Sequence, residues 1–95
     1  MNAAQPTVMA DNEQVRVTTV TFAATGATTG KHRHEFDYVV VPVTGGIFVV
    51  TEADGSLRQM TQIPGSPYLG PAGTTHDVAN AAGQESVFVE IELKR

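Results

Sequence analysis

The chain contains no cysteine among its 95 residues. Disulfide bonds and thiolate metal ligands are therefore excluded. The absence of thiols leaves the redox compartment open, although a bound iron would favour the reducing cytosol. A metal site in this protein would have to be built from other side chains, and histidine is the first to consider.

Positive charge is also scarce. Six Lys and Arg residues stand against ten Asp and Glu, which gives a formal net charge of −4. Without a basic patch, nucleic acids and anionic membranes are not expected as partners. No apolar run approaches the roughly 20 residues that cross a bilayer. Residues 1–14 also lack the cationic start and apolar core of a secretory signal, so we expect a soluble cytoplasmic protein.

Helical periodicity is missing as well, because no segment shows a sustained period of 3.6 with caps. Short stretches rich in β-branched residues alternate with glycine- and proline-containing turns at intervals of about 8–12 residues. This pattern predicts an all-β fold, an antiparallel sandwich or barrel. A chain of this length is expected to form one domain. We place a polar N-terminal arm, flexible or forming an edge strand in a dimer, at residues 1–14, and the barrel domain at residues 15–95.

Two dipeptides that contain glycine predict two of the expected turns. Residues 32–43 are predicted to form one strand, and Gly45-Gly46 is typical of a tight hairpin turn into the next strand. Asp54-Gly55 predicts a second hairpin.

The last predicted strand, residues 87–93, has two different faces. Successive side chains in a strand point to opposite sides. We interpret the apolar set as the core face and the set with the two glutamates as the solvent face, which leaves the glutamates without a catalytic use. The first set is Val87, Val89, Ile91 and Leu93, and the second is Phe88, Glu90 and Glu92.

All three histidines of the chain have a spacing typical of a metal site. His32 and His34 are two residues apart on a predicted strand, so both side chains are expected on the same face, with Cα atoms about 6.6 Å apart. His76 lies on a different strand and would complete a facial set of three if that strand is adjacent. Glu35 and Asp37 have the opposite parity, which disfavours a histidine–carboxylate triad.

Two stretches around these histidines resemble the signature motifs of the cupin superfamily. The first reads Gly-x5-His-x-His-x3-Tyr-x6-Gly, where the family normally has glutamate at the tyrosine position, Tyr38. The second reads Gly-x5-Pro-x-Gly-x2-His-x3-Asn and matches the family at every defined position. Together they run from Gly26 to Asn80, more than half of the chain. The matched residues are Gly26, His32, His34 and Gly45 in the first stretch, and Gly65, Pro71, Gly73, His76 and Asn80 in the second.

The resemblance implies a small β-barrel of the jelly-roll or double-stranded β-helix type with a divalent metal ion in its mouth. Carried over residue by residue, it implies that His32, His34 and His76 are the metal ligands. Iron(II) is the favoured metal, with zinc, nickel, manganese and copper as alternatives. The tyrosine removes the usual fourth protein ligand. Tyr38 could pack its ring, ligate weakly, or act as a hydrogen-bond donor or acid, and we name it as the candidate catalytic residue.

Three neutral imidazoles would leave a divalent ion with its full charge and with open coordination positions. Such a site should prefer small anionic, bidentate ligands, such as enolates, α-keto acids or diketonates. With iron(II) the resemblance to three-histidine cupins suggests a dioxygenase-type enzyme that acts on a small organic anion. The alternatives are a non-catalytic ligand- or metal-binding or sensing module, and a non-redox isomerase or lyase. No acid or base besides Tyr38 is expected inside the barrel.

Two further features have structural interpretations. Asn80 is expected to support the fold or to lie next to the ligands, and not to ligate. Val39, Val41 and Val43 make the strand face opposite the histidines apolar. An outer face of that kind is typically covered by another sheet or subunit, so we expect a homodimer.

Overall fold

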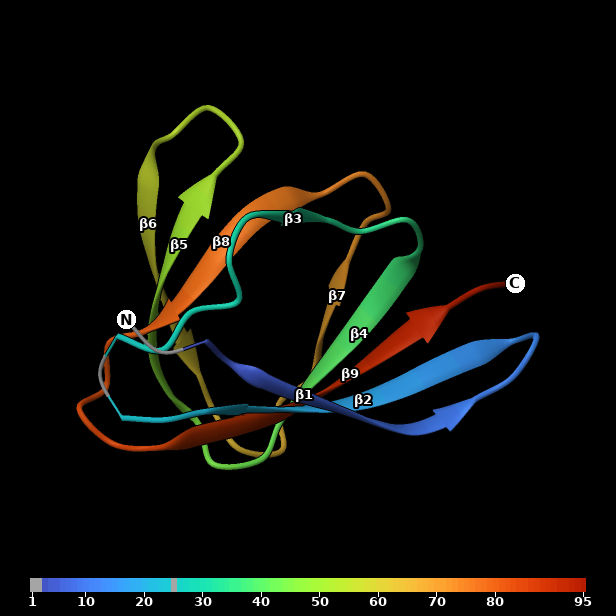
Figure 1. Ribbon diagram of the computed structural model, residues 1–95, viewed down its shortest axis with the longest axis horizontal. Coiled ribbons are helices and arrows are strands. Elements are labelled where there is room, and N and C mark those ends of the chain that lie inside the picture. Colours follow the sequence, from blue (N-terminus) through green and yellow to red (C-terminus); the bar gives the residue numbers. More distant parts are fainter. Residues whose placement is uncertain (1–2, 25) are drawn as a thin grey trace.

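The computed structural model describes residues 3–24 and 26–95, and its elements are strands throughout. Figure 1 shows the strands arranged as two sheets that face each other. The all-β prediction is therefore confirmed. The strands are β1 (Gln5–Asp11), β2 (Val15–Phe22), β3 (His32–Arg33), β4 (Asp37–Pro42), β5 (Gly46–Glu52), β6 (Leu57–Gln62), β7 (Tyr68–Gly70), β8 (Thr75–Asn80) and β9 (Ser86–Leu93).

The two sheets interleave strands from distant parts of the chain. One sheet has five strands in the order β1-β2-β9-β4-β7, and the other has four in the order β3-β8-β5-β6. All neighbouring strands are antiparallel. This is the jelly-roll arrangement that the sequence led us to expect. In the part of the chain that is described, no helix is long and apolar enough to span a membrane.

Three phenylalanines join the two sheets at one end of the interior. Phe22 on β2 lies 5.1 Å from Phe48 on β5 and 5.4 Å from Phe88 on β9, measured between ring centroids. Phe22 and Phe48 are fully buried. Burying each ring stabilises the fold by about 1.5–3 kcal/mol, and edge-to-face contacts add to that. Because this cluster closes one end of the barrel, the histidines at the other end face an interior that is left open.

The segment predicted as one strand over residues 32–43 is divided between the two sheets. Strand β3 belongs to the four-stranded sheet and β4 to the five-stranded sheet, so the chain crosses over at residues 34–36. His34 stays attached to the four-stranded sheet, next to the start of β8. Its N–H donates to the Thr74 carbonyl at 2.9 Å, and its carbonyl accepts from the Gly73 N–H at 2.8 Å. The continuous-strand prediction was wrong, although Tyr38 and Val40 face the interior as expected.

Gly45-Gly46 is not a hairpin turn. The strands on either side, β4 and β5, lie in different sheets and do not pair. Both glycines have positive φ, 75° and 135°, which lets the chain turn from one sheet to the other. The Asp54-Gly55 prediction is confirmed, since β5 and β6 pair antiparallel across that turn and the Glu52 N–H donates to the Ser56 carbonyl at 2.8 Å.

For residues 1–14 we expected a polar arm, flexible or forming an edge strand in a dimer. The described part of this segment contains β1, an edge strand of the chain's own five-stranded sheet. Strand β1 pairs with β2 from Gln5, opposite Thr21, to Asp11, opposite Arg16. The turn between the two strands is closed by the Asn12 side chain, whose Oδ1 accepts from the N–H groups of Gln14 and Val15. All seven β1 residues are exposed, so the strand has no buried face. A strand without a buried face does not need the regular alternation of apolar and polar residues by which it could be recognised in the sequence.

The interpretation of the two faces of the last strand was wrong. Phe88 is 5% exposed and Glu90 lines an internal cavity, so the glutamate face of β9 is the inner face. The valines and Ile91 form the outer face. The assignment failed because it equated apolar with inner, whereas this barrel has a polar interior at one end.

Asn80 supports the fold, as expected. It is 2% exposed, and its side-chain amide donates to the carbonyls of Ala23 and Gln84 at 2.9 and 2.7 Å. Its Oδ1 accepts from the Ala82 N–H at 2.9 Å. The side chain therefore connects the loop that follows β2 with the loop that follows β8, while β8 itself carries His76.

We predict that Asn80→Ala lowers the free energy of unfolding by about 2–4 kcal/mol, because three backbone groups lose their buried partner. Urea denaturation measures the change. Asn12→Ala is the matched control: it removes two hydrogen bonds at an exposed turn and should cost about 1 kcal/mol or less. Equal losses in the two variants would contradict the structural role given to Asn80.

Candidate metal centre

The three histidines lie together at the open end of the barrel. His32 on β3 pairs directly with His76 on β8, and His34 lies just beyond β3. The Nε2 atom of His34 is 3.1 Å from that of His32 and 3.2 Å from that of His76. All candidate ligand atoms of the three rings lie within 4.8 Å of one another. The convergence that the spacing suggested is therefore present. His32 and His34 do not share one strand, however, because His32 lies in β3 and His34 in the loop that follows it.

Hydrogen bonding determines which nitrogen of His32 is free. Its Nδ1 lies 2.8 Å from the Gly30 carbonyl, which can only accept, so Nδ1 carries the proton and Nε2 has a lone pair. A neutral His34 could donate a proton to only one of its two Nε2 neighbours. The other close nitrogen pair would then face each other without a proton, which is unfavourable. A cation between the three atoms would satisfy all of them.

The nitrogen separations also fit a single ion. Nitrogens bound at about 2.1 Å and at right angles around one ion would lie about 3.0 Å apart. The observed 3.1 and 3.2 Å are close to that separation. The residues present thus fit a divalent metal held by three imidazoles on one side, and the identity of the metal does not follow from the geometry.

The surroundings favour the neutral form of His34 and His76, the form that binds metal ions. Burial, with the charges of His32 and His76, lowers the pKa of His34 to about 4. Burial lowers the pKa of His76 too, and His32 adds to the effect. The site therefore disfavours protonation of two of the three imidazoles that would bind a metal ion.

Tyr38 packs against the centre from the other sheet. Its ring is 4% exposed and stacks on the His34 ring with centroids 3.8 Å apart and planes 16° from parallel. Burial raises the pKa of the Tyr38 hydroxyl, so the group stays protonated. The tyrosine that replaces the glutamate of the motif thus fixes the orientation of a candidate ligand through its ring.

Gly70 makes room for this stacking. It lies opposite Tyr38 in the pairing of β4 with β7, and a Cβ added to it would overlap the tyrosine ring. Sequence reasoning did not single out this glycine, because it falls at an unspecified position between Gly65 and Pro71.

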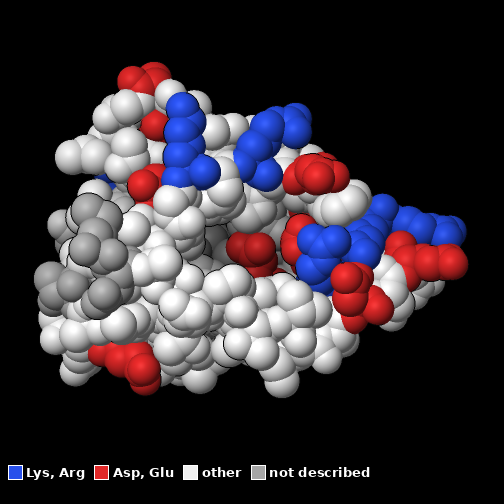
Figure 2. Space-filling view, viewed as in Figure 1, with Lys and Arg blue, Asp and Glu red and all other residues white. Residues whose placement is uncertain are grey.

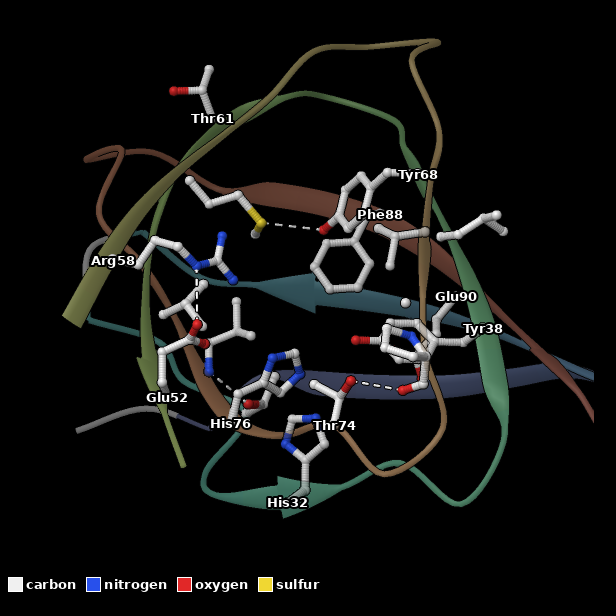
Figure 3. A pocket seen from close by; sticks show the side chains of 18 residues that line it. His32, Tyr38, Glu52, Arg58, Thr61, Tyr68, Thr74, His76, Phe88 and Glu90 are labelled. Atoms are coloured by element: carbon white, nitrogen blue, oxygen red, sulfur yellow. Dashed lines mark hydrogen bonds and ion pairs between the residues drawn. The ribbon is translucent and has the colours of Figure 1, made fainter. Parts of the chain in front are cut away.

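A cavity of about 560 Å³ adjoins the centre, lined by residues from both sheets. Figure 3 shows His32 and His76 on its wall, with Arg58 and Glu52 on one side and Tyr38 and Glu90 on the other. The Arg58 Nε lies 3.4 Å from a Glu52 carboxylate oxygen. Tyr68 accepts a hydrogen bond from Gln62 at 3.0 Å.

The expectation that Tyr38 is the one acid or base inside the barrel was wrong. Glu90 lines the cavity, and burial, with the nearby charge of Glu92, raises its pKa to about 7. Glu52 and Arg58 were also missed. The alternation of side chains along β9 could have indicated Glu90. Phe88 and Glu90 share a face of the strand, and a single phenylalanine between valines is compatible with an inner face as well as with an outer one.

The comparisons with known proteins bear on this arrangement. No family model matches the sequence. The chain is 47% identical to the β-alanine degradation protein BauB of Pseudomonas aeruginosa, over 96% of this chain and 94% of that protein. It is 44% identical to a cupin domain of Bordetella pertussis whose crystal structure it matches with a TM-score of 0.93, covering 99% of this chain and 96% of that one.

A more distant structure shares the fold alone. An RmlC-like cupin family protein with a double-stranded β-helix fold from Methanocaldococcus jannaschii is 13% identical, with a TM-score of 0.78 over 95% of this chain and 79% of that chain.

The shifted histidine pKa predicts how the metal-free protein responds to acid. Between the ordinary value of 6.5 and the folded value of about 4, the unfolded chain binds a proton at His34 that the folded chain does not. The free energy of unfolding should therefore fall as the pH drops from about 6.5 toward 4, and be at its full value above that range. Urea midpoints at several pH values measure this. His34→Gln should flatten the dependence, and an unchanged slope in that variant would contradict the assignment.

Gly70→Ala should displace the Tyr38 ring from His34, since the added methyl group occupies the space of the ring. We expect a loss of about 1–3 kcal/mol in the free energy of unfolding, typical of overpacking. We also expect shifted His34 side-chain resonances in NMR spectra. The control is Gly70→Ala combined with Tyr38→Ala, where the clash is absent and the effect of the alanine at position 70 should largely vanish. An effect of the same size in both backgrounds would argue against the clash.

Proposed function

The chain belongs to the cupin superfamily, and on that premise we propose that it is a metal-dependent enzyme with oxygenase-type chemistry on a small organic anion. The observation that carries the proposal is the convergence of three imidazoles on the wall of a polar cavity. A purely structural cluster of buried histidines would gain nothing from nitrogen lone pairs turned toward one another.

The metal ion is part of the proposal. His32, His34 and His76 would hold it, with iron(II) as the first choice and zinc, nickel, manganese or copper as alternatives. When bound, the ion would supply a Lewis acid with open positions for a bidentate anion and, as iron(II), for dioxygen.

The chain's own residues suit a small carboxylate. Arg58 presents a guanidinium group to the cavity, held by Glu52 on the neighbouring strand. Guanidinium groups bind carboxylates in a planar, paired geometry. Phe88, Met60 and Val50 give the cavity an apolar part that excludes water from the substrate's carbon atoms. Arg58 would thus orient the anion, and Tyr38 would keep the His34 ring in place.

The name of the Pseudomonas relative suggests the size of the substrate. That protein is described as acting in β-alanine degradation, and it shares 47% of its residues with this chain. β-Alanine is a three-carbon acid, and replacement of its amine by a carbonyl group would give a three-carbon oxo acid. We propose short oxo or hydroxy acids of this kind as the substrate class, because their two oxygen groups can bind one ion together.

One observation favours a second candidate, a non-redox isomerase or lyase. Such reactions need a proton-transfer group beside the metal. Glu90 lines the cavity with a pKa near 7. In this case zinc or manganese would be the metal of the purified protein.

Two accompanying predictions concern the state of the protein. The outer face of the five-stranded sheet carries half-buried Val39 and Val41 and exposed Leu69, 76% accessible. A homodimer through an outer apolar face remains our prediction, as does a cytoplasmic location.

The function is tested by elemental analysis of the purified protein, followed by oxygen uptake of the iron-loaded protein with a panel of short oxo acids, hydroxy acids and diketones. We expect about one metal ion per chain, oxygen uptake with at least one compound, and near-complete loss of bound metal in His76→Ala. Glu52→Gln, which leaves the three imidazoles intact, is the control and should keep its metal.

Each result separates the candidates. Zinc or manganese with no oxygen uptake would favour the isomerase or lyase. Tight binding of an anion without turnover under any metal would indicate a non-catalytic binding module. Unchanged metal content in His76→Ala would mean that the ligands are wrongly assigned.

A further inference from the structure

Glu90 occupies a distinctive position on the inner face of the five-stranded sheet. Its neighbours across the strands are Thr18 on β2 and Val40 on β4, both buried and neither charged. Figure 3 shows Glu90 beside Tyr38, across the cavity from Arg58. Glu90 therefore approaches the cavity from the sheet that does not contain the histidines, on the side opposite the guanidinium group that would hold a carboxylate.

The other acids near Glu90 are already paired. Glu92, the next inward residue of β9, lies 3.3 Å from Arg16, and Glu52 lies 3.4 Å from Arg58. Among the ion pairs and side-chain hydrogen bonds of the described residues, none involves the Glu90 carboxyl group. Its carboxyl group can thus gain or lose a proton without breaking an ion pair. Its pKa of about 7 means that both forms are available at neutral pH.

A second cavity of about 320 Å³ reaches Glu90 from the other side. It is lined by β1, β2 and β9, and includes Arg16, Thr18 and Glu92. Four residues line both cavities and therefore form the boundary between them. They are Thr29, His32, Phe88 and Glu90. Figure 2 shows a hollow on this side of the molecule with acidic side chains inside it. Of the four boundary residues, Glu90 is the one carboxylic acid.

We propose that Glu90 is a catalytic base of this enzyme, which takes a proton from the carbon next to the carbonyl group of a short oxo acid and releases it into the second cavity. The inference rests on the proposed function. The C–H bond breaks, its electron pair becomes the enolate of the substrate, and the proton forms the O–H bond of Glu90. The proton then passes to water on the Arg16 side, and the carboxylate is restored. No oxidant is needed for this step.

The charged and titratable groups that face Glu90 are consistent with this role. Glu92, on the same strand, raises the proton affinity of Glu90. Arg16 forms an ion pair with Glu92, so its positive charge is already neutralised. The groups on the elements around Glu90 are Glu92 on β9, Arg16 on β2, Tyr38 on β4, His32 on β3, Glu52 on β5 and Arg58 on β6.

The experiment measures proton exchange and needs no oxygen chemistry. Zinc-loaded protein is incubated in heavy water with pyruvate, a short oxo acid, and loss of the methyl proton signal is followed by NMR. Wild type should accelerate exchange over zinc ion alone. Glu90→Gln should slow this by at least about tenfold, with unchanged zinc content and pyruvate affinity by calorimetry. Glu90→Asp, which keeps a carboxyl group, should retain part of the rate. Glu85→Gln, which removes an exposed acid that lines neither cavity, should stay near wild type.

The outcomes distinguish the two proposals. Wild-type exchange rates in Glu90→Gln would overturn the role of Glu90 and leave the proposed function standing. Bound zinc and bound pyruvate without accelerated exchange in wild type would do the same. A wild type that binds neither zinc nor pyruvate would overturn the proposed function and this inference with it.

A second measurement needs neither metal nor substrate. Carbon-13 NMR of glutamate-labelled protein should show one carboxyl resonance that titrates near neutral pH and that is missing in Glu90→Gln. A Glu90 resonance that titrates near the ordinary glutamate pKa of about 4.3 would overturn the proposal.

Discussion

The close approach of three imidazole nitrogens is the constraint on which the rest of this structure depends. The Nε2 atom of a neutral His34 carries at most one proton and cannot satisfy both of its contacts, at 3.1 Å with His32 and at 3.2 Å with His76. The fold nevertheless holds them there, through the pairing of His32 with His76 and the hydrogen bonds of the His34 backbone. It also buries His34, which raises the cost of relieving the contact by protonation. Every surrounding feature that we describe either positions these rings or shapes the space beside them.

The two sheets of the barrel provide different residues of the site. The four-stranded sheet and the loop after β3 bring the histidines together, and the same sheet presents Arg58 to the cavity. The five-stranded sheet provides Tyr38 and Glu90 from the opposite side. The loss of the motif glutamate at position 38 therefore does not remove acid–base chemistry from the interior, since a carboxyl group reaches the cavity from β9. It does remove an anionic neighbour from the imidazoles, so that a bound cation would keep its full charge.

The sequence was sufficient for the fold class and for the meeting of the histidines, because strand alternation and motif spacing are local properties. It was insufficient where the answer depended on which sheet a strand joins. Residues 32–43 read as one apolar-alternating strand, yet the chain changes sheets in the middle, and Gly45-Gly46 repeats that change where a hairpin was expected. The inner face of β9 was misassigned for a related reason. Hydrophobicity marks the inner face at the Phe22 and Phe48 end, while the other end is polar inside.

The contact between Tyr38 and Gly70 has a consequence for how such sequences diversify. The absence of a side chain at position 70 is tolerable here because an aromatic ring from β4 fills the same volume. A chain with the shorter glutamate at position 38 has no such ring and leaves that volume free for a larger residue on β7. The two positions should thus covary among related barrels, an aromatic residue at the first occurring with glycine at the second.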